Sequence, residues 1–294
     1  MANSEIIGAG QDTARRAPKT NTITCGDCLE VMQAIPDKSV DMILCDLPYG
    51  TTACKWDVII PVDLLWNQYN RISTGVIVLF GAEPFASTLR LSNTKKYKYD
   101  LIWNKGWSGK FGIVKYRPFP QHENIIVFNK GNYNSVMKVG KPYFEKAKTV
   151  PQKYGNPHKY GVSGNLETTN IGSRYPGSIL EFNCQMMECN NTKRVHPTQK
   201  PVALFEYLIR TYSNEGDTVL DNCIGSGTTA IACINTGRNY IGIEKEDKYC
   251  RIAEERIHAL RSPAQDTMEI CHTAPNSPML QGLKPHAGGT GTSA

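Results

Sequence analysis

The sequence has no hydrophobic run long enough to cross a bilayer. A transmembrane helix needs about 18 or more consecutive apolar residues, whereas the apolar runs of this 294-residue chain are of strand length. The amino terminus also lacks the basic and hydrophobic segments of a secretory signal peptide. These absences argue against the membrane and secreted classes, so we expect a soluble, cytoplasmic protein without a membrane partner.

The ten cysteines lack the regular spacing of a disulfide framework. Several, such as Cys45, lie within apolar runs, so we expect reduced thiols. Cys25 and Cys28 form a C-x-x-C pair, but a tetrahedral zinc site needs four ligands. The next spaced pair, at 184 and 189, is distant and irregular, so we expect no metal.

Charge is distributed unevenly along the chain. Residues 93–195 contain 17 lysines and arginines against 6 acidic residues, whereas the rest of the chain contains 16 against 21. One contiguous third is therefore strongly basic, and aromatic residues lie among its cations. This asymmetry favours nucleic acid as a partner over the alternative, a well-solvated lysine-rich surface.

Apolar residues form short runs that alternate with amphipathic helical stretches. The expected strands are 41–45, 76–80, 99–103, 124–128, 218–220 and 240–243. A helix is expected to start at Pro201, because proline suits a first turn and apolar residues follow at helical spacing. Such strands, alternating with helices, predict an α/β fold with a mainly parallel sheet and helices on both faces.

Changes of composition divide the chain into segments. Residues 1–20 and 262–294 are polar and aperiodic, and we expect both to be flexible tails. Between 131 and 195 the strand–helix pattern stops, and Asn, Gly, Pro, Tyr and Lys dominate. We expect this stretch to be an insert between two halves of one α/β domain, 21–130 and 196–261.

A glycine-rich turn joins two expected strands within residues 218–244. Gly225 and Gly227 would let the backbone approach a ligand, and the helix that starts at Thr228 would offer free N–H groups to an anion. Glu244 follows at a distance where an acid can bind ribose hydroxyls. The unit predicts a site for an adenosine-containing cofactor. NAD stays a competitor because GSGTTA fits the loose dinucleotide pattern, and a strand-to-helix turn without a ligand is the structural alternative.

One acidic residue, Asp221, and one basic residue, Lys200, favour S-adenosylmethionine over NAD. Asp221 could pair with the ammonium group of that cofactor, which has no pyrophosphate to repel. In HPTQKP, residues 196–201, Lys200 precedes a helix start, where the helix dipole disfavours a cation. A cation placed there indicates an anionic ligand such as the methionyl carboxylate, with an exposed lysine as the alternative.

The apolar run VDMILC ends on DLPYG, residues 46–50, and not on a turn of Gly, Asn or Ser. Asp46 offers a hydrogen-bond acceptor, Pro48 fixes the backbone direction and Tyr49 offers a flat ring. This combination suits a planar molecule that carries an amino group.

DLPYG, HPTQKP and DNCIGSGTT, in this order, resemble the circularly permuted β group of N6/N4 DNA amino-methyltransferases. GDCLEVM, residues 26–32, is similar to the opening segment of that family. The resemblance covers about residues 22–130 and 196–260. It implies a Rossmann-like, S-adenosylmethionine-dependent enzyme that methylates adenine N6 in double-stranded DNA, with 131–195 as a target-recognition insert. Cytosine-N4 enzymes of the group usually carry Ser where this chain has Asp46.

The resemblance also implies catalytic roles for the tetrapeptide. Asp46 and the carbonyl oxygen of Leu47 would accept hydrogen bonds from the target amino group. Pro48 would fix the chain direction, and Tyr49 would stack on the flipped base. Leu47 replaces the usual proline but keeps the carbonyl, and it stays biased toward an extended backbone because Pro48 follows it.

Cofactor roles follow from the same resemblance. Asp27 would approach the adenine of the cofactor, Lys200 its carboxylate, Asp221 its methionyl part and Glu244 its ribose. The complete predicted set is Asp27, Cys28, Asp46, Thr198, Lys200, Asp221, Gly225, Ser226, Gly227, Thr228 and Glu244. Asp27 could equally be a helix N-cap, since it forms D-x-x-E with Glu30.

One departure from the family pattern concerns the cofactor loop. Asn222 and Cys223 stand in place of the usual Pro-Phe, which predicts poorer apolar packing near the cofactor. The glycines of the loop are intact.

Predicted DNA contacts lie outside the cofactor and catalytic motifs. They are Lys105, Trp107, Lys110, Arg174 and Arg194. The first three belong to the loop NKGWSGKFG, whose aromatic side chains could instead fold into the core. The insert 131–195 is expected to choose the DNA sequence, and a long disordered loop is the alternative.

The sequence leaves further alternatives for function and partners. An N4-cytosine methyltransferase, an inactive fold that only binds DNA, and an NAD-dependent dehydrogenase are the competing functions. A homodimer and a companion restriction endonuclease are additional expected partners, in a bacterial or phage setting near the nucleoid.

Overall fold

The structure is a computed structural model that describes residues 17–50, 57–106, 112, 114–145, 168–182 and 199–261. Apart from residues 17–20, the two expected tails lie outside this part of the chain. No helix in the described ranges is long and apolar enough to cross a membrane.

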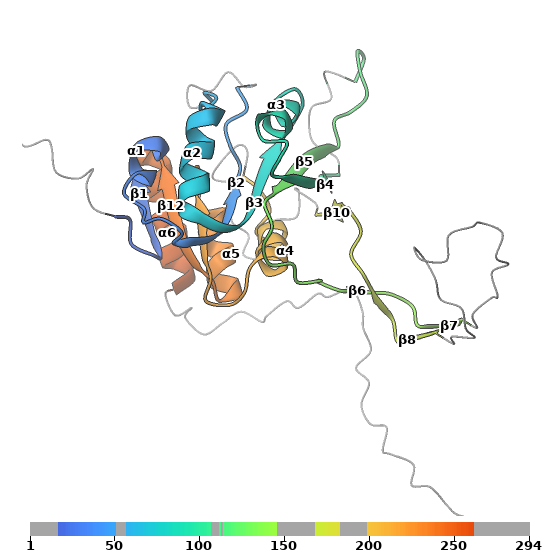
Figure 1. The fold of residues 1–294 in the computed structure, drawn as a ribbon. Coiled ribbons are helices and arrows are strands. Elements are labelled where there is room, and N and C mark those ends of the chain that lie inside the picture. Colours follow the sequence, from blue (N-terminus) through green and yellow to red (C-terminus); the bar gives the residue numbers. More distant parts are fainter. Residues whose placement is uncertain are drawn as a thin grey trace, which may run out of the picture. The chain divides into compact units, whose positions relative to one another are not determined.

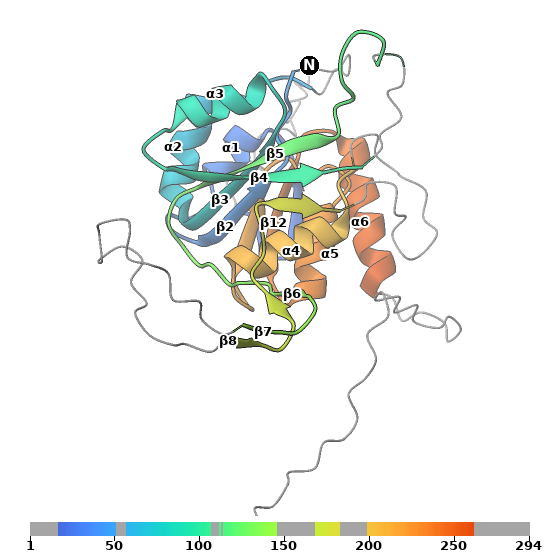
Figure 2. The same cartoon turned by 90° about the vertical axis from the view of Figure 1, so that its right-hand side faces the viewer.

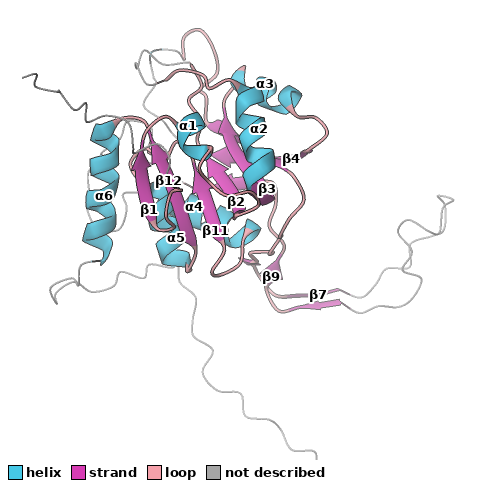
Figure 3. Cartoon of the chain, turned by 60° about the vertical axis from the view of Figure 1, so that its left-hand side comes forward, coloured by secondary structure: helices cyan, strands magenta, loops and turns pink. Residues whose placement is uncertain are grey.

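A sheet of eight strands forms the centre of the fold (Figures 1 and 3). The strands are β1 (Thr22–Cys25), β2 (Val40–Cys45), β3 (Ser73–Gly81), β4 (Tyr97–Asn104), β5 (His122–Phe128), β10 (Ile179–Glu181), β11 (Thr218–Asp221) and β12 (Asn239–Glu244). Their order across the sheet is β1-β12-β11-β2-β3-β5-β4-β10. All neighbouring pairs are parallel except those of β5, which runs antiparallel to β3 and β4.

Helices cover both faces of this sheet, as predicted (Figures 1 and 2). The helices are α1 (Cys28–Met32), α2 (Val62–Ile72), α3 (Phe85–Ser92), α4 (Val202–Tyr212), α5 (Thr228–Thr236) and α6 (Asp247–Arg261). Helices α1, α2 and α3 pack on one face, and α4, α5 and α6 pack on the other.

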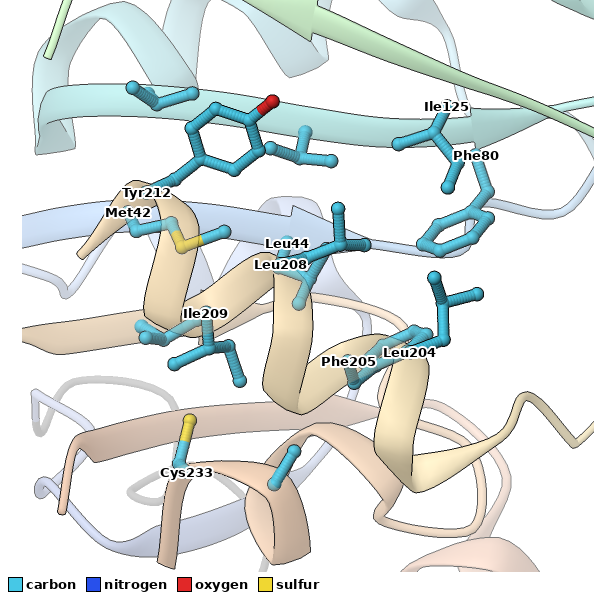
Figure 4. Packing of buried hydrophobic residues seen from close by; sticks show 14 of the residues in the cluster. Met42, Leu44, Phe80, Ile125, Leu204, Phe205, Leu208, Ile209, Tyr212 and Cys233 are labelled. Carbon is cyan, nitrogen blue, oxygen red and sulfur yellow. The ribbon is translucent and has the colours of Figure 1, made fainter. Parts of the chain in front are cut away.

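Alternating side chains of each central strand supply the two cores. In β2, Met42 and Leu44 face the α4 side, whereas Ile43 and Cys45 face the α2 side. This is the two-residue period of a strand, here with both faces buried, so the sequence reads as one continuous apolar run. Figure 4 shows Met42 and Leu44 against Leu208 and its neighbours on α4.

The predicted elements agree with the structure in their positions. Each of the six expected strands is present and is longer than expected by one to a few residues. Helix α4 starts directly after Pro201, as predicted, and α5 ends at Gly237, whose φ of +72° favours glycine. Strand β1 lies outside the predicted strands, because TITC is too short and polar to give a signal.

Cys25 and Cys250 form a disulfide that joins β1 to α6, so the expectation of reduced thiols is wrong for this pair. The two residues are 225 positions apart in the sequence, and α6 brings them together by packing beside β1. Cys25 is therefore not a free thiolate for a zinc site. Among the described residues no group of His, Cys, Asp and Glu side chains is arranged to hold a metal ion.

The expected insert contains two short antiparallel ribbons, β6 (Lys138–Val139) with β9 (Ser173–Arg174) and β7 (Tyr143–Glu145) with β8 (Thr168–Asn170). Strand β10 also lies within the expected insert, yet it completes the edge of the main sheet beside β4. The boundaries 131 and 195 therefore stay a prediction.

The two ends of the ribbon segment are hydrogen-bonded to the α/β fold at different levels of the sheet. After β5, the Asn134 N–H donates to the Thr211 carbonyl at 2.7 Å, at the end of α4. Before β10, the Ser178 carbonyl accepts from the Ile102 N–H at 2.8 Å. The segment is thus attached at its start beside the end of α4 and at its end to β4, near the carboxyl end of that strand.

The core on the α4 side gives the first test. We expect Leu208→Ala to lower the free energy of unfolding by about 2–5 kcal/mol, because Leu208 is fully buried and its removal leaves a cavity. Leu64→Ala on α2 is the control: Leu64 is 47% exposed, so its loss should cost about 0.5 kcal/mol or less. Urea unfolding measures both changes, and equal losses would contradict the burial of Leu208.

Candidate active site

A pocket of about 1020 Å³ opens at the carboxyl ends of the parallel strands. The ends of β2, β11 and β12 contribute to its lining, as does the loop before α1. Ligands of open α/β sheets bind at this edge, and the volume is at the upper end of that of small-molecule pockets. Because β5 is antiparallel, its first residues, His122 and Glu123, reach the same edge.

The loop after β2 directs Asp46 into this pocket and holds both of its carboxylate oxygens. The Tyr49 hydroxyl donates to Oδ1 at 2.7 Å, and the Lys200 ammonium donates to Oδ2 at 2.5 Å. The Tyr49 ring stacks on Phe85 of α3, with ring centroids 5.4 Å apart. Leu47 turns away and is 4% exposed in the α2-side core, so the side chain that replaces the family's proline serves packing.

Lys200 is buried among aromatic rings and two carboxylates. Its Nζ lies 3.3 Å from Glu123 Oε2 as well as 2.5 Å from Asp46 Oδ2. The same nitrogen lies 5.3 Å from the ring centroid of Phe80 and 5.9 Å from that of Trp103, distances at which a cation is attracted to a ring. The predicted contact of Lys200 with the cofactor carboxylate therefore stays a prediction, because in this structure its ammonium group binds Asp46.

A second lysine completes a chain of alternating charges. Lys105 Nζ lies 2.9 Å from Glu123 Oε1, and the Lys105 side chain is only 17% exposed. The sequence predicts that Lys105 lies in a loop that contacts DNA, and this contact stays a prediction; in the structure the Lys105 side chain forms part of the pocket wall. Glu123 is a site residue that sequence reasoning missed; its signal is an acid at the start of an otherwise apolar strand.

Burial and neighbouring charges shift the pKa values of this cluster. Burial raises the pKa of Asp46, and Lys200 offsets this only in part because Glu123 acts against it. Burial would also raise the pKa of Glu123, but Lys200 and Lys105 lower it to about 2. Burial disfavours the Lys200 cation, yet Asp46 and Glu123 outweigh this effect and raise its pKa.

The carboxylate of Asp221 holds the cofactor loop after β11 in place by two hydrogen bonds. Asp221 accepts from the Cys223 N–H at 3.0 Å and from the Thr229 hydroxyl. Gly225 and Gly227 adopt φ values of +54° and +84°, which side-chain-bearing residues rarely adopt. A Cβ on Gly227 would also lie 2.9 Å from the Cβ of Ala253. The loop thus gives a ligand direct access to backbone N–H groups at the start of α5.

Glu244 and Asp27 both line the pocket beside this loop, where the sequence places them near the cofactor. Glu244 accepts from the Gly225 N–H at 2.9 Å and from the Glu246 N–H at 2.8 Å. Asp27 caps α1 by accepting from the Leu29 N–H at 3.0 Å, so its N-cap reading is confirmed. Their contacts with ribose and adenine stay predictions, although acids beside a glycine loop fit an adenosine group.

Asn222 is better accommodated than the sequence suggests. It is 2% exposed, and its amide oxygen accepts from the Tyr69 hydroxyl of α2 at 2.5 Å. The polar side chain that replaces the family's proline is therefore hydrogen-bonded, and it links the cofactor loop to α2. The predicted loss of packing at this position is offset by that bond.

Most of the predicted site residues meet in one pocket. Its lining includes Asp27, Cys28, Asp46, Leu47, Pro48, Tyr49, Lys105, Lys200, Asp221, Gly225, Ser226, Thr228 and Glu244. Gly227 lies directly between two of these residues and is the N-cap of α5. Thr198, Trp107, Lys110 and Arg194 lie outside the described residues.

Arg174 does not join the pocket. It lies on β9, where its guanidinium covers the Tyr143 ring at 4.6 Å and donates to the Lys141 carbonyl at 2.5 Å. Its predicted contact with DNA stays a prediction.

The geometry defines a pocket for an adenosine-containing cofactor beside a carboxylate–tyrosine pair. A sequence profile of the N6/N4 DNA methylases matches residues 40–255, and this chain belongs to that DNA methylase family. The family uses S-adenosylmethionine, so the predicted family, fold and cofactor are confirmed.

Individual relatives agree with this assignment. Type II methyltransferase M.HpaI of Haemophilus parainfluenzae is 29% identical over 256 residues, which cover 80% of this chain and 73% of the relative. Type II methyltransferase M.HinfI of Haemophilus influenzae is 28% identical over 277 residues, covering 84% and 70%.

Solved structures give the same fold. The complex of M1.HpyAVI with S-adenosylmethionine is 26% identical, with a TM-score of 0.52 over 80% of this chain and 98% of that chain. The cytosine-N4-specific PvuII DNA methyltransferase has a TM-score of 0.58 at 16% identity, over 82% and 89%, and shows likeness of fold alone.

The Asp221 carboxyl provides a pH test of the cofactor loop. Burial raises its pKa to about 7, above the value of about 3.9 for an unfolded chain. The folded state therefore binds the extra proton, and the stability this contributes is lost as pH rises through about 7.

Comparison with Asp221→Asn, which cannot titrate, isolates this effect. The difference in unfolding free energy, wild type minus variant, should fall by about 1.4 kcal/mol per pH unit between about pH 5 and 7 and level off above. Urea unfolding at several pH values measures it. A difference that stays constant over this range would show that Asp221 titrates normally.

Proposed function

We propose that this chain transfers a methyl group from S-adenosylmethionine to N6 of adenine in double-stranded DNA. The observation that carries the proposal is the position of Asp46, whose carboxylate lies beside Tyr49 in the same pocket as the glycine loop of the cofactor. A hydrogen-bond acceptor, a ring and a cofactor loop at one strand edge are what methylation of an exocyclic amine requires.

The residues around Asp46 address the poor reactivity of the amine. The nitrogen lone pair of an exocyclic amine is delocalised into the base, so the amine is a weak nucleophile. Asp46 and the Leu47 carbonyl would each accept one amine hydrogen and direct the lone pair toward the methyl donor. Bound S-adenosylmethionine would supply the electrophilic methyl group, with the electron pair of the broken C–S bond staying on its sulfur. The methylated nitrogen would then lose one hydrogen as a proton to its acceptor, Asp46, and no covalent enzyme intermediate is needed.

The pocket also requires the target base to leave the duplex. The Asp46 carboxylate lies inside a pocket, and a base stacked in a helix would not reach it, so the base must flip. Tyr49, half-buried at the pocket wall, would then offer its ring to the flipped base. Its hydroxyl bond to Asp46 and its stacking on Phe85 hold the ring in place.

Double-stranded DNA is the partner that the family assignment implies, and finer partners are part of the proposal. M.HpaI and M.HinfI are named Type II methyltransferases, which supports a companion restriction endonuclease for this chain. We further propose a homodimer and a site of action at the DNA of a bacterial cell.

The methylated base tests the proposed function directly. After incubation of plasmid DNA with enzyme and cofactor, mass spectrometry of the nucleosides should detect N6-methyladenine, because an Asp at position 46 is typical of the adenine enzymes. N4-methylcytosine without N6-methyladenine would establish the cytosine alternative. DNA binding with neither product would establish the inactive fold.

Asp46→Ala serves as the negative control in that experiment. It should lower kcat by about a hundredfold or more, as for loss of a transition-state hydrogen bond, with DNA affinity little changed. Asp63→Ala, at an exposed first-turn position of α2, should leave kcat unchanged.

The recognised DNA sequence is a separate part of the proposal. Residues at the carboxyl edge of the sheet form the proposed sites for the cofactor and the target amine. We therefore assign recognition of the DNA sequence to another segment, residues 131–195. The described part of this segment carries Lys138, Lys141 and Arg174 beside the exposed aromatics Phe144 and Tyr175. Cations of this kind mostly contact phosphates, whereas Arg, Asn and Gln can also read base edges.

A chimaera tests the role of this segment. Replacing residues 131–195 by the corresponding segment of a relative with different specificity should move methylation to the relative's DNA sequence. Methylation-sensitive sequencing of a plasmid reports base and motif together. Replacing residues 262–294 is the control and should leave the motif unchanged. An active 131–195 chimaera that keeps the original motif would exclude the recognition role.

A further inference from the structure

Four charged side chains from four separate segments form one chain at the pocket wall. Lys105 follows β4, Glu123 lies at the start of β5, Lys200 precedes α4 and Asp46 follows β2. The contacts run from Lys105 to Glu123 at 2.9 Å, from Glu123 to Lys200 at 3.3 Å, and from Lys200 to Asp46 at 2.5 Å. The two cations and two carboxylates add to a net charge of zero.

The central cation of this chain is deeply buried. Lys200 is 8% exposed and has the rings of Tyr49, Phe80 and Trp103 around its ammonium group. A buried charge is costly unless partners compensate it, and removing one partner leaves the other uncompensated. Glu123 is therefore needed to balance the Lys105 and Lys200 charges.

Lys200 also donates a hydrogen bond to the Asp46 carboxylate, the group that the proposed reaction needs as an acceptor. Asp46 is the acceptor for the target amine, yet in this structure its Oδ2 accepts from Lys200 and its Oδ1 accepts from Tyr49. Each carboxylate oxygen can accept two hydrogen bonds, but an ammonium on Oδ2 draws negative charge from it, so the target amino group would bind Oδ2 more strongly once Lys200 moves to another acceptor.

The other acceptor is already in place. Glu123 Oε2 is buried and has no hydrogen-bond donor among the described residues, but it lies 3.3 Å from Lys200 Nζ. A movement of roughly half an ångström would bring the two atoms to the length of a charge-assisted hydrogen bond. Lys200 could thus change acceptors without entering solvent.

We propose that Glu123 is a positioning residue for methyl transfer: it takes the Lys200 ammonium when the target amino group binds Asp46. This inference rests on the proposed function and adds two roles to it. Glu123 frees the acceptor for the amine, and its negative charge keeps the four-residue cluster neutral, so no net positive charge of the cluster opposes the positive charge that develops on the amine nitrogen. Both effects act on the reacting amine through Lys200 and Asp46, without contact between Glu123 and the substrate.

Glu123→Gln tests the proposal because it removes the charge and keeps the shape. Lys200 then has Asp46 as its single carboxylate partner, and the cluster carries a net positive charge that opposes the developing charge on the amine. We expect kcat to fall at least tenfold, while the Kd for S-adenosylmethionine, measured by calorimetry, changes less than threefold.

The pH profile distinguishes this role from a structural one. Asp46 faces Lys200, Glu123, Tyr49, Asp221 and Cys45. Since methyl transfer needs ionised Asp46, kcat should decline on the acid side as Asp46 is protonated. The Glu123 charge favours that protonation, so in Glu123→Gln the acid limb should move to lower pH. Glu123→Asp keeps the charge and should restore both the position of the limb and part of kcat.

Asp100→Asn is the matched control. Asp100 pairs with Arg90 at 2.9 Å and has a side-chain exposure of 22%, similar to the 15% of Glu123, but it lies outside the pocket lining. It should leave kcat and the acid limb unchanged. The rates are divided by the concentration of cofactor-binding sites, so that only folded enzyme is counted. The proposal is overturned if Glu123→Gln then leaves kcat and the acid limb unchanged, as Asp100→Asn should.

Two further outcomes keep the test decisive. If Glu123→Gln does not fold, Glu123→Asp decides: a reduced kcat with an unshifted acid limb supports the proposal, and a kcat equal to that of wild type overturns it. If the wild-type enzyme methylates neither adenine nor cytosine, the proposed function itself fails, which the wild-type assay shows before any variant is compared.

Discussion

The bond between Lys200 and Asp46 connects the two parts of the chain on which catalysis depends. The two residues are 154 positions apart, and their side chains meet at 2.5 Å at the pocket wall. Because both charges are largely removed from water, the pair is favourable only with further compensation, which Glu123 and Lys105 provide. The position of the catalytic loop is therefore tied to the start of α4 and to the beginning of β5.

The antiparallel direction of β5 makes this arrangement possible. In a parallel strand, residues at the carboxyl edge come from the strand end, whereas β5 brings its first residues, His122 and Glu123, to that edge. The strand then continues into the sheet as a buried apolar run and supports Phe80 and Trp103 on its two neighbours. One strand thus supplies both the counter-charge and part of the framework around Lys200.

The α/β fold and the positions of the motifs could be predicted from the sequence, because apolar runs and glycine turns are local signals. DLPYG and the GSG loop follow strands, and parallel strands bring their ends to one edge, so Asp46 and Asp221 could be placed in one site. The partners of Lys200 could not be predicted, since ion pairing across 154 residues leaves no local pattern. The ion pair of Lys105 with Glu123 could not be predicted for the same reason, because a lysine in a glycine-rich loop looks solvated until its buried acceptor is known. Asn222 looked unfavourable because its partner, Tyr69, lies on a distant helix.

The start and end of the described fold meet at Tyr240. Its hydroxyl donates to the Asn21 carbonyl at 3.0 Å, and Arg261 at the end of α6 also interacts with it. Strand β1 starts and α6 ends at the amino edge, whereas the pocket opens at the carboxyl edge. A fluorophore, affinity tag or surface tether joined at either point would thus be anchored on the side opposite the pocket.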